Sequence, residues 1–436
     1  MSSGAQAQVS LRGPQDAYLL STEESTFWRA AYTRHTNAAI AELQQNFNMT
    51  PSYGANKILA TITRNGDLVS CIYLHTKLQP ISYPNNDFSI APNRFAAYVD
   101  SFPHALIDSV VAKIGQTEFD TQYGYYMEMM EALMSPPQKL MGEQNFRYNT
   151  LEMRAIQSTF AQELWTPLKF WFCRFYEQAL PYVALYWHDI SLELSTRKLS
   201  ELVQFAGGAT IANTTVPANI DTLNLLVDYV YLDGPERDNF MAAKTESGAE
   251  SEDDPSTYME YVFDQVQFLG PNIVGVSGGS TAHNIRFNHP VQEILWACQQ
   301  KSALDANDHF NWDGPTVAGT VAGLTRPTDC FKTARMSLNN NERVIPLAAN
   351  YFRLVQPSQY HSRNPAADRR LYCYCFGIAP ENMLDTGSVN FSRLDNATLT
   401  LEYLTTLPSP ITTYIYARSK NIMKVQNGMA GRKYAA

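Results

Sequence analysis

The sequence predicts an antiparallel all-β protein built from two sandwich domains, and three observations support this fold class. Apolar side chains recur at every second position in several segments, which is typical of strands buried on one face. Residues that favour turns separate these segments. Helical periodicity is rare, and strands without interleaved helices favour an antiparallel sheet over a parallel one. The chain has 436 residues, more than one ordinary hydrophobic core serves, so we expect two domains.

The alternation is clearest in five segments, which lie in both halves of the chain. In residues 189–195, for example, Ile190, Leu192 and Leu194 occupy one face of the predicted strand and Glu193 lies on the other. We expect strands at 57–63, 189–195, 223–231, 397–403 and 414–417.

Three other segments have the period of a helix. Their apolar residues recur every three or four positions, so we expect helices within 24–42, 125–134 and 290–300. A few helices are compatible with a fold whose core consists of strands.

The composition along the chain suggests the order of the domains. Residues 1–25 are expected to form a polar N-terminal arm and residues 26–208 the first sandwich. A segment rich in Gly, Ala, Thr and Asn, 209–220, is expected to link it to the second sandwich, 221–436. This second sandwich contains an acidic run at 246–254, which we interpret as a solvated loop, and it ends in a basic segment after Arg418.

Charge and composition exclude several classes of protein. The 33 Lys and Arg against 42 Asp and Glu give a net charge of −9, which opposes a role in coating nucleic acid. The N-terminus lacks the layout of a signal peptide, and no run of about 18 apolar residues could cross a bilayer. Six cysteines without CxxC spacing are too few for a disulfide framework, so we expect buried free thiols in a reducing compartment.

A series of motifs runs in a fixed order along nearly the whole chain. In the first half these are GPQDAYL at 13–19, STFWRAAYTRHTN at 25–37, RNGDL at 64–68, PLKFWF at 167–172 and ALPYVALYWHDI at 179–190. The second half contains DYVYLD at 228–233, FNHPVQE at 287–293, YFRLVQP at 351–357 and GSVNFSRLDN at 387–396. In this order they resemble the major capsid proteins of nucleocytoplasmic large DNA viruses, with the chlorovirus type nearest.

Two features depart from the pattern of that family. Leu384 and Asp385 precede Thr386 and Gly387, at positions where the family often has Gln-Pro. The resemblance therefore does not predict the conformation of this turn. The acidic run at 246–254 resembles an insertion.

The resemblance implies a double jelly roll, that is, two consecutive eight-stranded antiparallel sandwiches with short helices in the connecting loops. It implies a structural protein of an icosahedral virion, not an enzyme, that forms a pseudo-hexameric homotrimer and packs against neighbouring capsomers. Minor capsid proteins and an internal membrane are further expected partners, without direct contact to nucleic acid. Assembly is expected in the host cytoplasm, and no cofactor or metal is expected.

Two family motifs supply the candidate site residues. The first reads as a hairpin turn, because Asn-Gly and Gly-Asp suit the tight turns of hairpins, and its residues are Arg64, Asn65, Gly66 and Asp67. The second motif is interpreted as a turn followed by a strand. Gly387 lies in the turn and permits a positive φ there. Arg393 and Asp395 are expected on one side of that strand, paired with each other or across a subunit boundary. The candidate residues of this motif are Gly387, Asn390, Phe391, Ser392, Arg393, Asp395 and Asn396.

The stretch around Trp28 mixes aromatic and basic residues. Trp28 and Tyr32 are four positions apart and share one face of a helix, as in an ordinary packed helix. The resemblance implies an alternative, a segment on the inner side of the capsomer that contacts minor capsid proteins or the membrane. Its candidate contact residues are Phe27, Trp28, Arg29, Tyr32 and Arg34.

Motifs for catalysis and metal binding are weak. Gly275-Val-Ser277-Gly-Gly279 fits the GxSxG pattern, but a nucleophile elbow needs a helix after it, and the following residues read as loop and strand. The eight histidines include no HxH or HExxH spacing, so no zinc or iron site is predicted. A two-domain carbohydrate-binding protein stays open as an alternative function, since jelly rolls also occur in lectins and aromatic side chains stack on sugars.

Overall fold

The structure is a computed structural model that describes most of the chain. The described residues are 35–81, 95–135, 142–148, 150–206, 215–242, 259–276, 279–318, 325–365, 369–404 and 407–434, together with Gln6 and Ser10. The chain divides into two units, Met1–Ala38 and Ala39–Ala436, and both sandwiches belong to the second unit.

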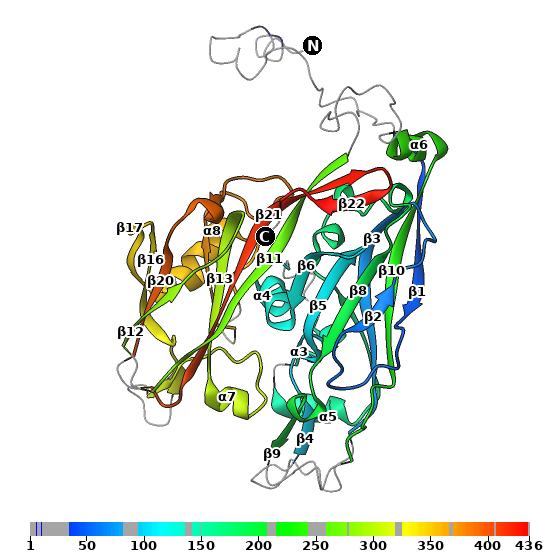
Figure 1. Cartoon of the computed structure of the whole chain (residues 1–436). Coiled ribbons are helices and arrows are strands. Elements are labelled where there is room, and N and C mark those ends of the chain that lie inside the picture. Colours follow the sequence, from blue (N-terminus) through cyan, green and yellow to red (C-terminus); the bar gives the residue numbers. More distant parts are fainter. Residues whose placement is uncertain are drawn as a thin grey trace. The chain divides into compact units, whose positions relative to one another are not determined.

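The first sandwich consists of two four-stranded antiparallel sheets (Figure 1). One sheet has the order β1 (Ala38–Asn46), β10 (Thr222–Leu232), β3 (Leu68–Leu78) and β7 (Gln162–Pro167). The other has the order β2 (Ile58–Thr61), β8 (Ile190–Thr196), β5 (Ile107–Ile114) and β6 (Thr117–Tyr123). Two short strands, β4 (Phe95–Tyr98) and β9 (Val203–Ala206), pair with each other beside them.

The second sandwich repeats this arrangement. Its first sheet has the order β11 (Met259–Val274), β21 (Ile411–Gln426), β13 (Pro290–Gln300) and β18 (Leu371–Cys375), with β19 (Val389–Asn390) and β22 (Met429–Arg432) attached. Its second sheet has the order β12 (Ser280–Asn284), β20 (Ala397–Tyr403), β16 (Phe331–Leu338) and β17 (Asn341–Ala348). The short pair β14 (Thr316–Ala318) and β15 (Thr325–Pro327) stands apart.

Both sandwiches have the strand order of a jelly roll. If the eight main strands of each are numbered along the chain, strands 1-8-3-6 form one sheet and strands 2-7-4-5 form the other, in both sandwiches. Two Greek keys in each sandwich place strands side by side that are far apart in sequence, as observed here. The predicted double jelly roll is therefore confirmed, and we refer to the two sandwiches as the first and second rolls.

Short helices occupy the connections. The α-helices are α3 (Phe102–Leu106), α4 (Gly124–Met134), α5 (Leu151–Ser158), α6 (Gly234–Ala242), α7 (Lys301–Asp305) and α8 (Gln356–Tyr360). Single turns of other helix types are η2 (Glu143–Asn145), η3 (Trp171–Cys173), η4 (Tyr176–Gln178), η5 (Tyr182–Ala184), η6 (Leu199–Glu201), η9 (Tyr351–Val355) and η10 (Phe391–Arg393). The helix predicted at 125–134 is α4, and no described helix is both long enough and apolar enough to cross a bilayer.

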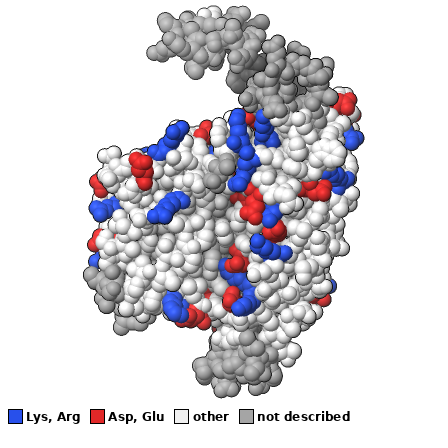
Figure 2. Space-filling model, in the orientation of Figure 1, with Lys and Arg blue, Asp and Glu red and all other residues white. Residues whose placement is uncertain are grey.

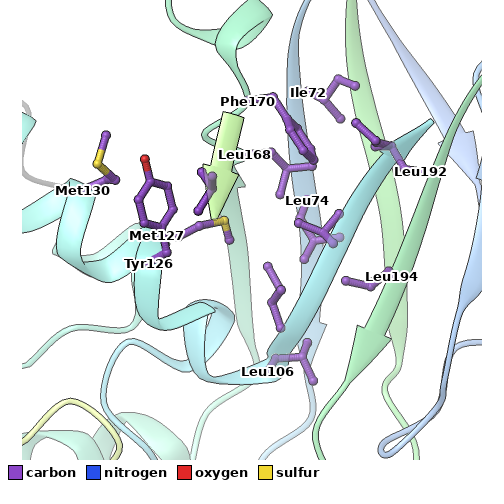
Figure 3. Close-up of a cluster of buried hydrophobic side chains, with 14 of the residues drawn as sticks. Ile72, Leu74, Leu106, Tyr126, Met127, Met130, Leu168, Phe170, Leu192 and Leu194 are labelled. Atoms are coloured by element: carbon purple, nitrogen blue, oxygen red, sulfur yellow. The ribbon is translucent and has the colours of Figure 1, made fainter. Parts of the chain in front are cut away.

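Each roll is held together by the apolar faces of its two sheets. In the first roll, alternate residues of β3 and β8 point into one core, where Ile72 and Leu74 meet Leu192 and Leu194 (Figure 3). All four side chains are at most 2% exposed. The five strands predicted from alternation are present as β2, β8, β10, β20 and part of β21.

The helix predicted at 290–300 is wrong, because these residues form strand β13. Ile294 and Trp296 face the core of the second roll, whereas Leu295 and Ala297 belong to the core that includes the first roll. With both faces buried, the strand loses its polar alternation, and a short, continuously apolar run is compatible with either structure. The helix expected within 24–42 is also wrong at its end, since β1 begins at Ala38, and its earlier part lies outside the described residues.

The predicted boundary between the rolls needs correction. Strand β10, which we assigned to the second roll, pairs with β3 from Thr222 opposite Lys77 to Val230 opposite Leu68. It is the eighth strand of the first roll, so the segment 209–220 connects two strands of the same roll. The chain enters the second roll after Leu232, and the acidic run at 246–254 lies outside the described residues.

The predicted hairpin at Arg64–Asp67 is wrong as well. Strands β2 and β3, on either side of it, belong to opposite sheets, so the motif forms a corner between sheets. A Cβ atom on Gly66 would lie 2.7 Å from Cβ of Tyr229, so glycine is required there by close packing.

Candidate functional site: the interface between the two rolls

The sheet that contains β11 and β21 contributes side chains to two cores: its inner face to that of the second roll, and part of its outer face to the core that includes the first roll. Trp171 of the first roll lies 4.7 Å from Phe263 of β11 between ring centroids, and Tyr125 of α4 stacks on Tyr414 of β21 at 4.8 Å. Aromatic pairs at such distances add to the burial of their apolar area. The two rolls therefore share one continuous apolar core.

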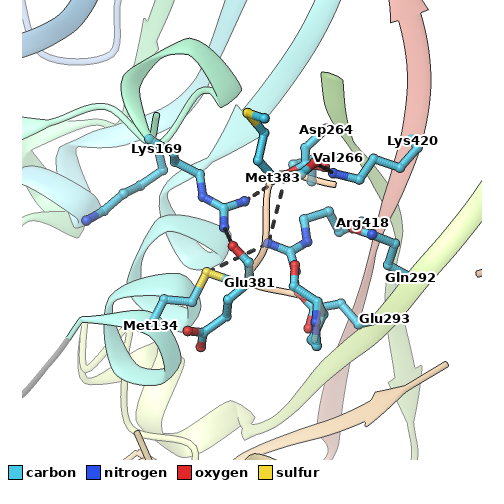
Figure 4. A network of polar contacts seen from close by, with 12 residues as sticks. Met134, Lys169, Asp264, Val266, Gln292, Glu293, Glu381, Met383, Arg418 and Lys420 are labelled. Carbon is cyan, nitrogen blue, oxygen red and sulfur yellow. Dashed lines mark hydrogen bonds and ion pairs between the residues drawn. The ribbon is translucent and has the colours of Figure 1, made fainter. Parts of the chain in front are cut away.

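A cluster of buried charges crosses this interface, and we call it the ionic cluster (Figure 4). Arg174 of the first roll donates to Asp264 of β11, with Nη1 and Oδ2 2.7 Å apart. Lys420 Nζ lies 2.6 Å from the other oxygen of Asp264. Arg418, which is 1% exposed, pairs with Glu293 of β13 at 3.1 Å between Nη2 and Oε1. Each buried carboxylate of the ionic cluster thus faces at least one cation.

The cations keep the two carboxylates ionised. Burial alone would raise the pKa of Glu293, but the positive charges of Arg418 and His361 lower it to about 2. Burial acts in the same direction on Asp264, and the charges of Arg418, Arg174 and Lys420 lower its pKa below the usual value. Neither group is a proton donor near neutral pH, which indicates a structural role.

Two further polar contacts join the rolls. Arg369 donates from Nε to Glu128 of α4 at 3.0 Å. Asp120 of β6 accepts the backbone N–H of Val266 of β11 at 2.8 Å. Burial raises the pKa of Asp120 to about 7, although this hydrogen bond opposes the shift.

On the face drawn in Figure 2, acidic and basic side chains gather along the middle, and wide uncharged areas lie on either side.

Three side chains beside the ionic cluster could bind a metal ion. One donor atom each from His361, Cys373 and Cys375 lies within 4.8 Å of the other two. Sequence reasoning missed this group, because the histidine precedes the first cysteine by 12 positions and no known spacing relates them. The usable signal was the Cys-x-Cys pattern, since alternate residues of a strand lie on one face.

The first predicted motif ties the sheet corner to neighbouring strands. Arg64 donates to Asp189 at 3.3 Å, and its guanidinium lies 4.9 Å from the ring centroid of Tyr182. Asp67 accepts the backbone N–H of Leu232 at 2.9 Å, while Asn65 donates to the side chain of Thr63. These contacts are structural and lie entirely in the first roll.

The second motif braces the start of β13 in the second roll. Gly387 has the positive φ that we predicted, at +130°. Asn390 caps η10 by accepting the backbone N–H of Ser392, and the hydroxyl of Ser392 accepts the backbone N–H of His289 at 2.9 Å. Phe391 is buried between them. The two motifs therefore lie in different rolls and form no common site.

The expected strand positions of Arg393 and Asp395 are wrong. Arg393 belongs to the helical turn η10 and Asp395 to the loop after it, and both are exposed. The backbone N–H groups of Asp395 and Asn396 donate to the side chain of Asn339, in the turn between β16 and β17. This end of the motif thus fixes a turn.

Several predictions lie outside the described residues. These are the contact candidates Phe27, Trp28, Arg29, Tyr32 and Arg34, the residue Ser277 and residues 209–214 of the segment 209–220. The GxSxG segment itself joins β11, which ends at Val274, to β12, which begins at Ser280. A strand follows where a nucleophile elbow needs a helix, so this segment is not an elbow.

Comparison with known proteins identifies the family. The family described as "Large eukaryotic DNA virus major capsid protein" matches residues 255–431, and "Major capsid protein N-terminus" matches residues 26–233. The first-half match ends at residue 233 and the second-half match begins at residue 255. This division agrees with β10 as the last strand of the first roll.

Two curated relatives match over nearly the whole length of both chains. The major capsid protein of Pyramimonas orientalis virus is 28% identical over 456 residues, with 99% of each chain covered. That of Paramecium bursaria Chlorella virus 1 is 28% identical over 480 residues, again with 99% of each covered.

Solved structures show the same fold. A chain of the PBCV-1 virus capsid has a TM-score of 0.73 and 23% identity, covering 94% of this chain and 100% of its own. The Faustovirus major capsid protein has a TM-score of 0.69 and 12% identity, with 96% of each covered. The chain has two jelly rolls joined by a buried interface, family matches in both halves and relatives that align over 99% of each chain. It therefore belongs to the major capsid proteins of large eukaryotic DNA viruses, a family of structural proteins of the icosahedral virion shell and not of enzymes.

Proposed function

We propose that three copies of the chain form a closed homotrimer whose six jelly rolls act as one tile of the capsid. The observation that supports this proposal is the identical strand order of the two rolls within one chain. A chain with two similar lobes, repeated by a threefold axis, gives six similar lobes in a ring. Such a pseudo-hexameric capsomer fits a hexagonal lattice of neighbouring capsomers.

The buried interface supports this arrangement because a tile must keep its lobes in a fixed orientation. The ionic cluster and the aromatic pairs set one relative position of the two rolls, since a shift would separate Arg174 from Asp264 in an apolar surrounding.

Exposed apolar side chains at the seam of the two rolls support a contact with a second copy of the chain. Tyr176, Ile378 and Leu384 are 71, 79 and 70% exposed. Tyr176 belongs to the first roll and the other two to the second. The two segments are joined, because Arg174 donates to the carbonyl of Glu381 at 2.9 Å. We call these three side chains the seam patch, and a threefold contact would remove them from water.

Light scattering on the purified full-length chain tests the trimer. We expect the mass of three chains at micromolar concentration, together with six-lobed particles in electron micrographs. A stable monomer at that concentration would refute the proposal, and a dimer would require a different symmetry.

We further propose that the N-terminal segment lies on the inner side of the capsomer. There it would face minor capsid proteins and an internal membrane. We also propose that the capsid is assembled in the host cytoplasm. Aromatic rings beside arginines suit the boundary between apolar and charged surfaces of lipid. Replacing Trp28 and Tyr32 by alanine should reduce sedimentation of the full chain with vesicles of anionic lipid several-fold. Phe160→Ala, at an exposed aromatic of the first roll, is the control. Equal sedimentation of all three proteins would refute this placement.

A further inference from the structure

A buried cluster in the second roll has the composition of a structural metal site. Cys373 and Cys375 are alternate residues of β18, and both side chains face the first roll. The side chain of His361, which follows α8, is fully buried beside them, with Nε2 3.4 Å from Sγ of Cys375. One donor atom from each of the three residues lies within 4.8 Å of the other two.

A fourth donor comes from the neighbouring strand. Glu293 of β13 is fully buried, with Oε2 3.1 Å from Nε2 of His361 and 3.9 Å from Sγ of Cys375. Donor atoms around a tetrahedral Zn²⁺ lie about 3.3 to 3.8 Å apart, given bond lengths of about 2.0 to 2.3 Å. The distances among Glu293, His361 and Cys375 are within a few tenths of an ångström of this range, and the donor atom of Cys373 lies within 4.8 Å of those of His361 and Cys375.

The surroundings match those of a zinc site beyond its ligands. The other ring nitrogen of His361, Nδ1, lies 3.1 Å from a carboxylate oxygen of Glu381. A carboxylate in this position holds a ligating histidine in the correct tautomer and raises its basicity. Two thiolates and one carboxylate exceed the charge of Zn²⁺ by one, and the guanidinium of Arg418 beside Glu293 offsets this excess.

Without a metal, the same residues form an ion pair. Burial alone would lower the pKa of His361, but the charge of Glu293 and the hydrogen bonds of the ring raise it to about 11. A protonated His361 between Glu293 and Glu381 accounts for the two carboxylates. In this state the thiols make long, weak contacts, that of Cys373 to the carbonyl of Phe352 at 3.8 Å and that of Cys375 to Glu293 at 3.9 Å. Soft thiolates combined with imidazole favour Zn²⁺ over the harder cations.

We propose that His361, Cys373, Cys375 and Glu293 bind one Zn²⁺ ion that stabilises the second roll at its interface with the first. On binding, the ion replaces the proton on Nε2 of His361 and the two thiol protons, which pass to solvent. The ion would connect β13, β18 and the segment after α8, three parts of the chain that are far apart in sequence.

The test measures the metal in the purified full-length protein after expression with added zinc. Elemental analysis should find about one zinc per chain in the wild type and less than about a tenth of that in a Cys373→Ser, Cys375→Ser variant. The matched control is Cys298→Ser, Cys330→Ser, a second pair of buried neighbouring cysteines, which should retain the zinc of the wild type.

Cobalt provides a second readout, whose first part uses only the wild type. Replacing zinc by Co²⁺ in the wild type should give the near-ultraviolet charge-transfer band of thiolate ligation. His361→Ala, which keeps both thiols, should weaken Co²⁺ binding at least about tenfold. Wild-type protein that contains no zinc and gives no thiolate band with Co²⁺ would overturn the proposal. Zinc held equally by the wild type and the Cys373→Ser, Cys375→Ser variant would overturn it as well.

Discussion

Single residues determine how the two rolls meet, because the polar contacts of the interface are buried and specific. Breaking a buried ion pair such as Arg418 with Glu293 leaves an uncompensated charge, at a cost of about 3–5 kcal/mol. An apolar interface alone would tolerate small shifts of one roll against the other. With the ionic cluster present, any shift separates Arg174 from Asp264, so these residues specify one arrangement.

Asp120 makes the same interface sensitive to pH. Its pKa is about 7 in the folded protein, because burial disfavours the charged form, and near 4 in the unfolded chain. Between these values the folded state binds the additional proton, so its stability decreases as the pH rises. We expect the stability of the wild type relative to Asp120→Asn to fall by up to about 1.4 kcal/mol per pH unit from pH 4 to pH 7 and to level off above pH 7. Urea unfolding of both proteins at several pH values measures this difference.

An exposed carboxylate provides the control for Asp120. Asp305 pairs with Lys301 on the surface, and its side chain is 61% exposed. The difference between the wild type and Asp305→Asn should stay small and constant over the same pH range. A difference between the wild type and Asp120→Asn that does not change with pH would contradict the elevated pKa.

At the scale of elements, strands with one buried face were predictable from the sequence and strands with two were not. Strand β8 alternates because its outer face is less buried, whereas β13 is buried along almost its whole length. The second face of β13 is covered by the first roll, and no local pattern encodes this packing. The assignment of β10 failed for a related reason, since its partner β3 lies about 150 positions earlier in the chain.

The interface between the rolls depends on contacts that are even less visible in sequence. Arg174 and Asp264 are 90 positions apart, and Glu128 and Arg369 are 241 apart. Each residue alone resembles an ordinary surface charge. The family motifs indicated that Gly387 and its neighbours matter, and the structure assigns them to bracing a strand and a turn. The motif residues are therefore structural supports within each roll, whereas the residues of the interface between the rolls became visible only in three dimensions.

At the scale of the whole molecule, one chain combines two similar rolls in a single unit. The outer sheet of the second roll is buried against the first roll, so neither roll presents a complete surface of its own. This arrangement commits both rolls to the same subunit, and the exposed apolar groups are candidates for the contacts between subunits that we propose. The seam patch is one such group, since it combines side chains from both rolls.

The seam patch makes a specific prediction about the trimer. Leu384→Asp places a charge where a neighbouring chain would exclude water, and burying an unpaired carboxylate costs several kcal/mol. Three such contacts occur in a closed trimer, so we expect the concentration for half-dissociation to rise at least about tenfold. Ile345→Asp is the matched control, because Ile345 is 60% exposed on β17, away from the seam. Light scattering over a dilution series measures both variants. If Leu384→Asp stays as trimeric as the wild type, the seam patch is not the subunit contact. If both variants dissociate, added charge alone weakens the trimer, and the result does not locate the contact.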